Sequence, residues 1–284
     1  MNRSVVWVPA GVDAGEIAID HRFASAGEAL GCFGRTLVIL EEGATINLTI
    51  TYRTAGETGF SIDHLREIVV GKGAKLHLSE AVEVGEGSTL SLHSYTRQDA
   101  DSHIHSVFTC AGEGDARVAL HSDLAGEGAE AELYGLYIAT DHQKTDVELG
   151  LNHTAPNCRS RQLVKGIVAG EATGVFTGMV FVGREAQKTD AAQQNRNIQL
   201  TDTARVYTRP QLEIYADDVR CAHGATVGQL AEEEIYYMRQ RGISEAVARR
   251  MQMQGFAADI TLRSHSASFH ELVSAAVEEK IDNI

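Results

Sequence analysis

Apolar and polar residues alternate one by one through most of the first two thirds of the chain. In the segment that contains Ile46, Leu48 and Ile50, every second side chain is apolar. Successive side chains of a β-strand point to opposite faces, so this period of two predicts strands that bury one face and expose the other. Apolar residues at helical spacing are absent from this region. We therefore expect the region to consist of short strands.

Glycine-containing turns separate these alternating segments at regular intervals. The glycines at positions 43, 73, 87, 114 and 128 are 30, 14, 27 and 14 residues apart, values close to 14 or to twice 14. Such spacing indicates a repeat of turn and strand. The Asn-Gly and Asp-Gly loops that favour antiparallel hairpins do not occur between the segments. We therefore predict a mainly β fold, a right-handed parallel β-helix whose coils each contain two half-coils. An antiparallel sandwich with glycines in its loops is the alternative.

Near Gly228 the pattern changes to helical spacing. Acidic residues lie in the first turn of an expected helix, which Gly242 ends. Two more helices are expected, one from Glu245 to about Gln254 and one from Ser268 to about Lys280. The sequence thus predicts a parallel β-helix core at residues 1–227 and a small C-terminal α-helical domain at residues 228–284. Because open strand edges invite other chains to pair, we expect part of this helical domain to cover one end of the solenoid.

The composition is that of a soluble globular protein. Hydrophobic residues make up 43% of the 284 positions, which is enough for a substantial core. The formal net charge of -14 repels phosphate groups, so we expect neither nucleic acid nor an anionic membrane as a partner. No apolar run approaches the roughly 18 residues that span a bilayer, and no secretory signal is present, so the expected location is cytoplasmic. The four cysteines, Cys32, Cys110, Cys158 and Cys221, lie far apart, which favours reduced thiols over disulfides or a structural zinc site.

Several motifs in the second half of the chain fit the pattern of one family. They occupy residues 153–161, 187–191, 195–197, 209–219, 221–228 and 239–244. On these motifs the chain resembles the SufB/SufD family of iron-sulfur cluster assembly proteins, and it is more similar to SufD than to SufB members. The resemblance implies a right-handed parallel β-helix core with a C-terminal helical domain, in agreement with the glycine-marked repeat.

The resemblance also implies partners. Family members bind SufC, an ABC-type ATPase, through the C-terminal helical domain, and they pair with one another through the β-helix core. We therefore expect a SufBCD-type complex, with a SufC-like ATPase and either a SufB-like subunit or a second copy of this chain. The expected docking residues for SufC are Tyr236, Tyr237, Arg239, Arg241 and Gly242. The chain contains no G-x-x-x-x-G-K-[ST] phosphate loop, so we expect nucleotide binding in the partner and a non-catalytic scaffold role here.

Cys221 and His223 are the expected site for iron or a transient iron-sulfur cluster. Thiolate and neutral imidazole are the side chains here that bind iron best, and residues two apart on a strand point to the same face. Two donors are too few for a cluster, which usually takes about four, so we expect a partner chain to supply the rest at a dimer seam. The alternative is a packing role for Cys221 and a hydrogen-bonded role for His223 at a strand end. Cys158 is a reserve candidate, although an isolated cysteine beside a strand is more often a packing residue.

Two features depart from the family pattern. Ala204 stands where SufB members place a candidate cluster-ligand cysteine, so we do not expect this chain to form the complete scaffold by itself. The sequence also opens on strand-like segments at residues 5–8 and 17–19, without the N-terminal helical region of longer SufD proteins. We expect whatever that region contributes to be missing or to come from another chain.

Two other functions stay open at the level of sequence. A structural adaptor that recruits or stimulates SufC without binding iron would need neither Cys221 nor His223. A carbohydrate-active β-helix enzyme would need acidic residues along an open groove, and the C-terminal motifs argue against it. His103 and His105 alternate on one strand face, as metal ligands do, but no third ligand is adjacent in sequence. An exposed polar face is therefore the favoured interpretation of these two histidines.

Overall fold

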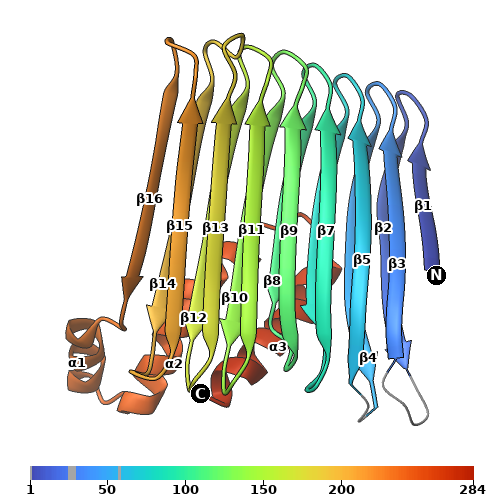
Figure 1. Cartoon of the computed structure of the whole chain (residues 1–284). Coiled ribbons are helices and arrows are strands. Elements are labelled where there is room, and N and C mark those ends of the chain that lie inside the picture. The colour runs from blue at the N-terminus through green and yellow to red at the C-terminus, as the bar shows by residue number, and fades with distance from the viewer. Residues whose placement is uncertain (1, 25–29, 57–58) are drawn as a thin grey trace.

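The computed structural model describes residues 2–24, 30–56 and 59–284, and its strands wind into a two-sided coil (Figure 1). The described part contains two 8-stranded parallel sheets, one made of the odd-numbered strands and one of the even-numbered strands. The strands are β1 (Asn2–Val8), β2 (Asp13–Ala24), β3 (Leu30–Leu40), β4 (Thr45–Ala55), β5 (Phe60–Val70), β6 (Lys75–Glu83), β7 (Thr89–Gln98), β8 (His103–Cys110), β9 (Asp115–Leu124), β10 (Glu130–Ala139), β11 (Lys144–His153), β12 (Arg159–Val168), β13 (Thr173–Val182), β14 (Asp190–Gln199), β15 (Arg205–Ile214) and β16 (Arg220–Gly228). The predicted mainly β fold, a parallel β-helix, is confirmed.

Each coil contains one strand from each sheet. Thr45 pairs with Lys75, and Lys75 pairs with His103, so these coils take 30 and 28 residues. Gly43 and Gly73 lie in the turns that precede β4 and β6, and their φ angles are 68° and 65°. This left-handed conformation is easily adopted by glycine and by few other residues. The glycine repeat of the sequence therefore marks the corners of the coil.

Inward side chains stack in columns from coil to coil. Ile46, Leu76 and Ile104 lie in register on β4, β6 and β8, and all three are buried. Neighbouring strands lie about 4.8 Å apart, which puts side chains of one column in van der Waals contact. Full burial of an aliphatic side chain is worth roughly 1.5–3 kcal/mol, so the alternating pattern decides which face of each strand points inward.

Three helices follow the last strand. They are α1 (Glu232–Gln240), α2 (Glu245–Thr261) and α3 (Ala267–Asp282). Ser244 and Ser266 cap α2 and α3, because each hydroxyl accepts a hydrogen bond from a backbone N–H in the first turn. Within the described residues, none of the helices is long and apolar enough to cross a membrane.

The second helix is longer than its sequence pattern suggests. The predicted end near Gln254 is wrong, because α2 continues to Thr261. Gly255 does not end the helix, although glycine lowers helix stability by about 1 kcal/mol relative to alanine. Met253 and Ile260 are buried on either side of it, and this packing outweighs the local preference.

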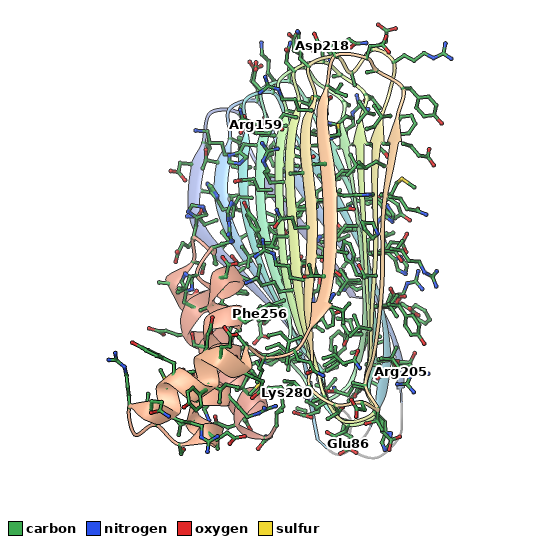
Figure 2. The ribbon with its side chains drawn as sticks, turned by 90° about the vertical axis from the view of Figure 1, so that its left-hand side faces the viewer. Glu86, Arg159, Arg205, Asp218, Phe256 and Lys280 are labelled. Atoms are coloured by element: carbon green, nitrogen blue, oxygen red, sulfur yellow. The ribbon has the colours of Figure 1, made fainter. Side chains whose placement is uncertain are left out.

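The helices lie against the outer face of the even-numbered sheet and do not cover the end of the solenoid, as Figure 2 shows in a view onto the last coil. Val107, Leu136 and Ile167 face outward from β8, β10 and β12. They share one buried apolar cluster with Ile260 of α2 and Phe269 of α3. The expectation that the helical segment covers an end is therefore wrong. The physical reason is that this part of the sheet is apolar on both faces, so its outer face also has to be buried.

Two buried lysines tie the helices to the β-helix. Lys165 of β12 forms a 2.7 Å ion pair with Asp259 and lies 4.4 Å from the ring centre of Phe256, both in α2. Lys280 of α3 forms a 2.7 Å ion pair with Glu113 in the turn after β8. These two ion pairs connect α2 and α3 to the β-helix.

The change from strand to helix lies between the end of β16 and the start of α1. The division into a core at 1–227 and a helical domain at 228–284 stays a prediction, because both parts share one apolar cluster.

The C-terminal end of the β-helix is open. No strand among the described residues pairs with the outer edges of β15 and β16. Most side chains of β16 are exposed, and Tyr207, Ile214 and Val227 are exposed apolar residues of these two strands. The last coil therefore presents both unpaired backbone groups and apolar side chains to its surroundings.

Candidate functional site

Cys221 and His223 lie on β16, at this open end. Strand β16 pairs with β14, and the two residues lie opposite Ala191 and Gln193, which are buried in the interior of the β-helix. Parallel strands in register keep the side chains of one column on one face. Cys221 and His223 therefore share a face and extend two interior columns to the last coil.

The Cys221 side chain is half-buried. It packs against a small apolar cluster that includes Val182, Ala186 and Ala191. Burial raises the pKa of the Cys221 thiol, and a hydrogen bond with the Ala191 backbone opposes that effect. The thiol is therefore protonated at neutral pH, and thiolate coordination of iron requires loss of that proton.

His223 is exposed, because no further coil covers its column. Among the described residues, no three His, Cys, Asp or Glu side chains are grouped so that they could hold a metal ion. Cys221 and His223 thus present at most two donors, whereas a cluster takes about four. Any cluster at this position needs donors from outside the described part of the chain.

Cys158 lies in the turn between β11 and β12 and is only 1% exposed. Its Sγ donates a hydrogen bond to the carbonyl oxygen of Gly126 at 3.3 Å, and burial raises the pKa of the thiol. Cys158 directly precedes β12, and β14 lies between β12 and β16. Cys158 is therefore not adjacent to Cys221. This environment favours packing over ligation for Cys158.

Ala204 is fully buried in the turn between β14 and β15. The 10 residues of β15 separate this turn from the start of β16, where Cys221 lies. At about 3.3 Å per residue, the two positions are roughly 30 Å apart along the strands. Figure 2 shows this separation along the strands, with Arg205 near their lower ends and Asp218 in a turn at their upper ends. A thiol at position 204 of the same chain would not reach Cys221.

The residues expected to dock SufC form an exposed corner at the end of α1. Tyr236 and Tyr237 are 63% and 57% exposed. The guanidinium of Arg241 lies 4.6 Å from the ring centre of Tyr237, and Arg239 forms a 3.2 Å ion pair with the first residue of α2. Gly242 has a φ of 85°, which lets the chain turn sharply into α2. These five side chains and backbone groups lie close together, and docking itself stays a prediction.

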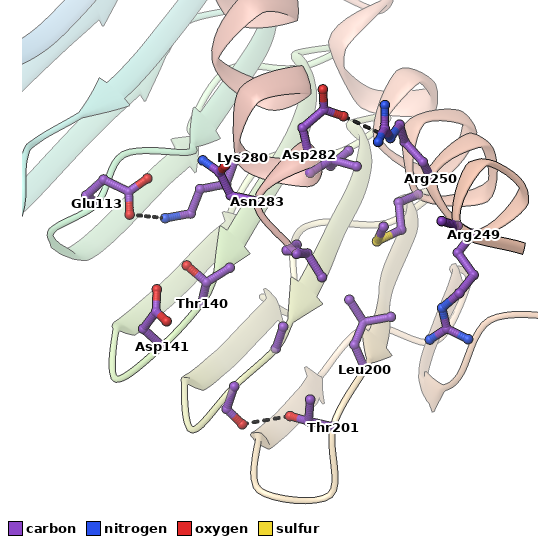
Figure 3. A pocket seen from close by; sticks show the side chains of 16 residues that line it. Glu113, Thr140, Asp141, Leu200, Thr201, Arg249, Arg250, Lys280, Asp282 and Asn283 are labelled. Atoms are coloured by element: carbon purple, nitrogen blue, oxygen red, sulfur yellow. Dashed lines mark hydrogen bonds and ion pairs between the residues drawn. The ribbon is translucent and has the colours of Figure 1, made fainter.

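A hollow of about 600 Å³ lies between α2, α3 and the turns at the lower end of the β-helix (Figure 3). Its charged groups are largely paired with one another: Lys280 bonds Glu113, and Arg250 forms a 3.0 Å ion pair with Asp282. Thr201, in the same turn as Ala204, lines its far side. The hollow is therefore at the opposite end of the strands from Cys221, and it contributes no group to the candidate site.

His103 and His105 do not form an exposed polar face, so that interpretation is wrong. His105 is only 9% exposed; its Nδ1 lies 3.0 Å from Glu132, and its Nε2 lies 2.7 Å from the Arg263 carbonyl oxygen. The connection between α2 and α3 covers His105, and the His265 ring centre lies 4.6 Å from that of His105. These contacts attach the helices to the sheet. The sequence did not show them, because residues 105 and 265 meet only through the tertiary fold.

The interior of the last coils is polar, a feature that the alternating pattern did not predict. Tyr137 Oη donates a 2.6 Å hydrogen bond to Asn197 Oδ1, and Gln193 Nε2 donates a 2.8 Å hydrogen bond to Gln162 Oε1. All four side chains are buried. The signal in the sequence is a run of amides at alternating positions in β14, where earlier strands have Leu or Ile at the inward positions.

Comparison with known proteins identifies the family. The sequence model described as "SUF system FeS cluster assembly, SufBD core domain" matches residues 22–256. The chain belongs to the SufB/SufD family. This SufB/SufD family member thus combines the family's core domain with an open last coil that carries Cys221 and His223.

Individual relatives agree with this assignment. SufD of Escherichia coli is 36% identical over 184 residues, which cover 65% of this chain and 43% of that protein. A SufBD family protein of Mycobacterium tuberculosis is 31% identical over 267 residues, 90% of this chain and 66% of that protein. SufD of Bacillus subtilis is 21% identical over 278 residues, 97% of this chain and 63% of that protein. The predicted likeness to SufD is confirmed, and the chain spans between 43% and 66% of the length of these relatives.

Proposed function

We propose that this chain is a SufD-like, non-catalytic scaffold subunit that supports iron-sulfur cluster assembly in a SufBCD-type complex. One observation carries the proposal: Cys221 and His223 share a face on the last strand of a SufB/SufD-family β-helix. Iron or a nascent cluster is the cargo, held transiently. A thiol and an imidazole on one open face are a suitable partial ligand set for it.

A second β-helix supplies the missing donors. The open edges of β15 and β16 offer unpaired backbone groups to a SufB-like subunit or to a second copy of the chain. Position 204 lies at the other end of the strands, so two β-helices that meet end to end in opposite orientations would bring position 204 of one close to Cys221 and His223 of the other. A SufB-like chain with a cysteine there would add a donor that Ala204 does not supply.

The ATPase activity of this complex belongs to a cytoplasmic SufC-like partner. Its docking site is the corner at Tyr236, Tyr237, Arg239, Arg241 and Gly242, where two exposed aromatic side chains and two arginines suit a protein interface. Lys165 and Lys280 fasten α2 and α3 to the sheet, so a force applied to the helices is passed to the coils.

Anaerobic co-purification with SufB-like and SufC-like candidates tests the partners and the cargo together. We expect a stable complex that contains iron and acid-labile sulfide after assembly, and no ATPase activity from this chain alone. A chain that binds neither candidate would contradict the proposal. Binding of SufC together with absence of iron in every complex would favour the adaptor function.

Substitution of the two candidate ligands tests the site in cells. We expect Cys221→Ala and His223→Ala each to lower the activity of iron-sulfur enzymes at normal protein level. Cys32→Ala and His142→Ala are matched controls on other parts of the β-helix and should leave that activity unchanged. Wild-type activity in both site variants would contradict the assignment of Cys221 and His223 as ligands and would favour the adaptor function.

A further inference from the structure

The column of amides that ends at His223 has a direction. Gln162, Gln193 and His223 occupy the same position on β12, β14 and β16. Gln193 Nε2 donates its hydrogen bond to Gln162 Oε1, on the side away from β16. In a stack of amides along neighbouring strands, the N–H and C=O groups of one side chain point in opposite directions. The Gln193 carbonyl therefore points towards the coil that carries His223.

That carbonyl oxygen has no partner. Gln193 is fully buried, and its Oε1 accepts no hydrogen bond from any described residue. A buried polar atom without a partner costs roughly 1–3 kcal/mol, so a donor close to it is favoured. His223 is the next residue of the column, and strands of one sheet are about 4.8 Å apart, so an imidazole N–H can reach the oxygen.

The facing sheet makes room for this amide. A Cβ atom at Gly178 of β13 would lie 2.3 Å from Gln193 Nε2, so any larger residue would displace the side chain. Gln193 is held between Gly178 on one side and Gln162 on the other. Gly178 and Gln162 thus fix the orientation of the Gln193 amide independently of any contact with His223.

We propose that Gln193 is the positioning residue for His223: its Oε1 accepts one imidazole N–H and leaves the other ring nitrogen free, facing the open end. An imidazole has one donor and one acceptor nitrogen, so holding the N–H inward fixes which nitrogen keeps its lone pair. Metal-binding histidines commonly use such a second hydrogen bond for orientation. The use of the free nitrogen as an iron donor rests on the proposed function, whereas the contact itself does not.

Nitrogen NMR of the purified full chain with 15N-labelled histidine tests the contact without iron. The His223 ring signals are assigned by their loss in His223→Gln. We expect one dominant neutral tautomer in the wild type and a mixture of two in Gln193→Leu. Gln193→Asn, whose amide is one methylene shorter and cannot reach, should give the same mixture if the leucine variant is unstable.

Gln194→Leu is the matched control. Gln194 is the next residue of β14, faces outward and accepts a 3.0 Å hydrogen bond from Arg196. It should leave the His223 signals unchanged. Identical His223 ring-nitrogen shifts in the wild type, Gln193→Leu and Gln193→Asn would overturn the proposal, whatever the effect of His223→Ala in cells.

Iron-sulfur enzyme activity in cells separates this proposal from the function it rests on. If both hold, Gln193→Leu lowers activity and adds nothing to the loss caused by His223→Ala in the double variant. A His223→Ala variant with full activity would contradict the proposed function and leave the NMR result standing. A further loss in the double variant would show that Gln193 acts independently of His223.

Discussion

At the scale of single residues, charged and polar side chains are buried among the apolar columns in the interior of this β-helix. Arg66 on β5 and Glu80 on β6 point into the same coil and form an ion pair at 1% and 0% side-chain exposure. Arg66 Nε also donates a 3.0 Å hydrogen bond to Ser94. Two charges in a low-dielectric interior are tolerated only as a pair, so each residue depends on the other.

Arg66→Met should therefore destabilise the fold strongly. The substitution leaves the Glu80 carboxylate buried without its counter-charge, which costs about 3–5 kcal/mol. The midpoint of urea unfolding, followed by circular dichroism, measures the loss. Arg35→Met is the control, because Arg35 pairs with Glu67 on the surface, where an ion pair is worth about 0–1 kcal/mol. Equal losses in the two variants would contradict the prediction.

His153 should make the protein sensitive to mild acid. Burial lowers the pKa of His153 from its ordinary value of 6.5 to about 4. The unfolded chain then takes up a proton near pH 6.5, whereas the folded chain does not until about pH 4. The free energy of unfolding therefore falls as the pH decreases from 6.5 towards 4, by about 2 kcal/mol at pH 5.

Urea unfolding at pH 7.5 and pH 5 of the wild type and His153→Gln checks this sign. The variant should lose about 2 kcal/mol less between the two pH values. His142→Gln carries the same substitution at an exposed position and should behave like the wild type. A variant that loses as much stability as the wild type would show that His153 is not the titrating group.

At the scale of elements, α2 and α3 are held by the sheet rather than by each other alone. Their buried residues share a cluster with outward-facing residues of β8, β10 and β12. Lys280 adds a polar anchor: its Nζ donates hydrogen bonds to Glu113 at 2.7 Å and to Gln143 at 2.9 Å, both on the β-helix. The end of α3 therefore depends on two hydrogen bonds to the turns of the sheet.

Lys280→Met should loosen α3 without unfolding the β-helix. A hydrogen bond to a charged group is worth about 1.5–3 kcal/mol, so amide hydrogen exchange in α3 should rise roughly 10- to 100-fold. Exchange measured by mass spectrometry should stay unchanged in β10 and β12. Lys188→Met, at an exposed lysine that pairs with Asp218, is the control and should not change exchange in α3. Unchanged protection of α3 in Lys280→Met would contradict the role of this anchor.

At the scale of the whole molecule, the open last coil is where a partner can extend the solenoid. Val227 is 45% exposed on β16, on the same face as Cys221 and His223. The helices leave this end uncovered because they are bound to the side of the sheet. Assembly and the candidate site are therefore expected to share one surface.

Val227→Asp should weaken pairing with a SufB-like subunit at least about 10-fold. An unpaired carboxylate buried in an interface costs more than the 1.4 kcal/mol that corresponds to that factor. Analytical ultracentrifugation or calorimetry measures the change. Val5→Asp places the same charge on an exposed valine at the other end of the β-helix, and it should leave pairing intact. Greater loss in Val5→Asp than in Val227→Asp would move the interface to the first coil.

Local patterns in the sequence predicted the strands and corners of the β-helix, because period-two alternation and turn glycines act within one strand and one corner. They left an antiparallel sandwich open, and the family motifs decided between the two folds. Ile46 and Leu76 show the alternation, and Gly43 and Gly73 show the corners. Local patterns failed for α2, where buried contacts carry the helix past Gly255. They failed also for the helical segment, which packs on the outer apolar face of the sheet and not on the end of the coil.

The candidate site divides in the same way. The sequence by itself determined the family, the parallel strands and the shared face of Cys221 and His223, because these depend on motifs and on neighbours two residues apart. Only the tertiary structure decided that Gln193 lies beside His223, that Ala204 lies at the far end of the strands and that His105 meets His265. The two contacts depend on the register between coils and on the docking of helices, which join residues about 30 and about 160 positions apart, whereas the sequence pattern records only the face of each strand.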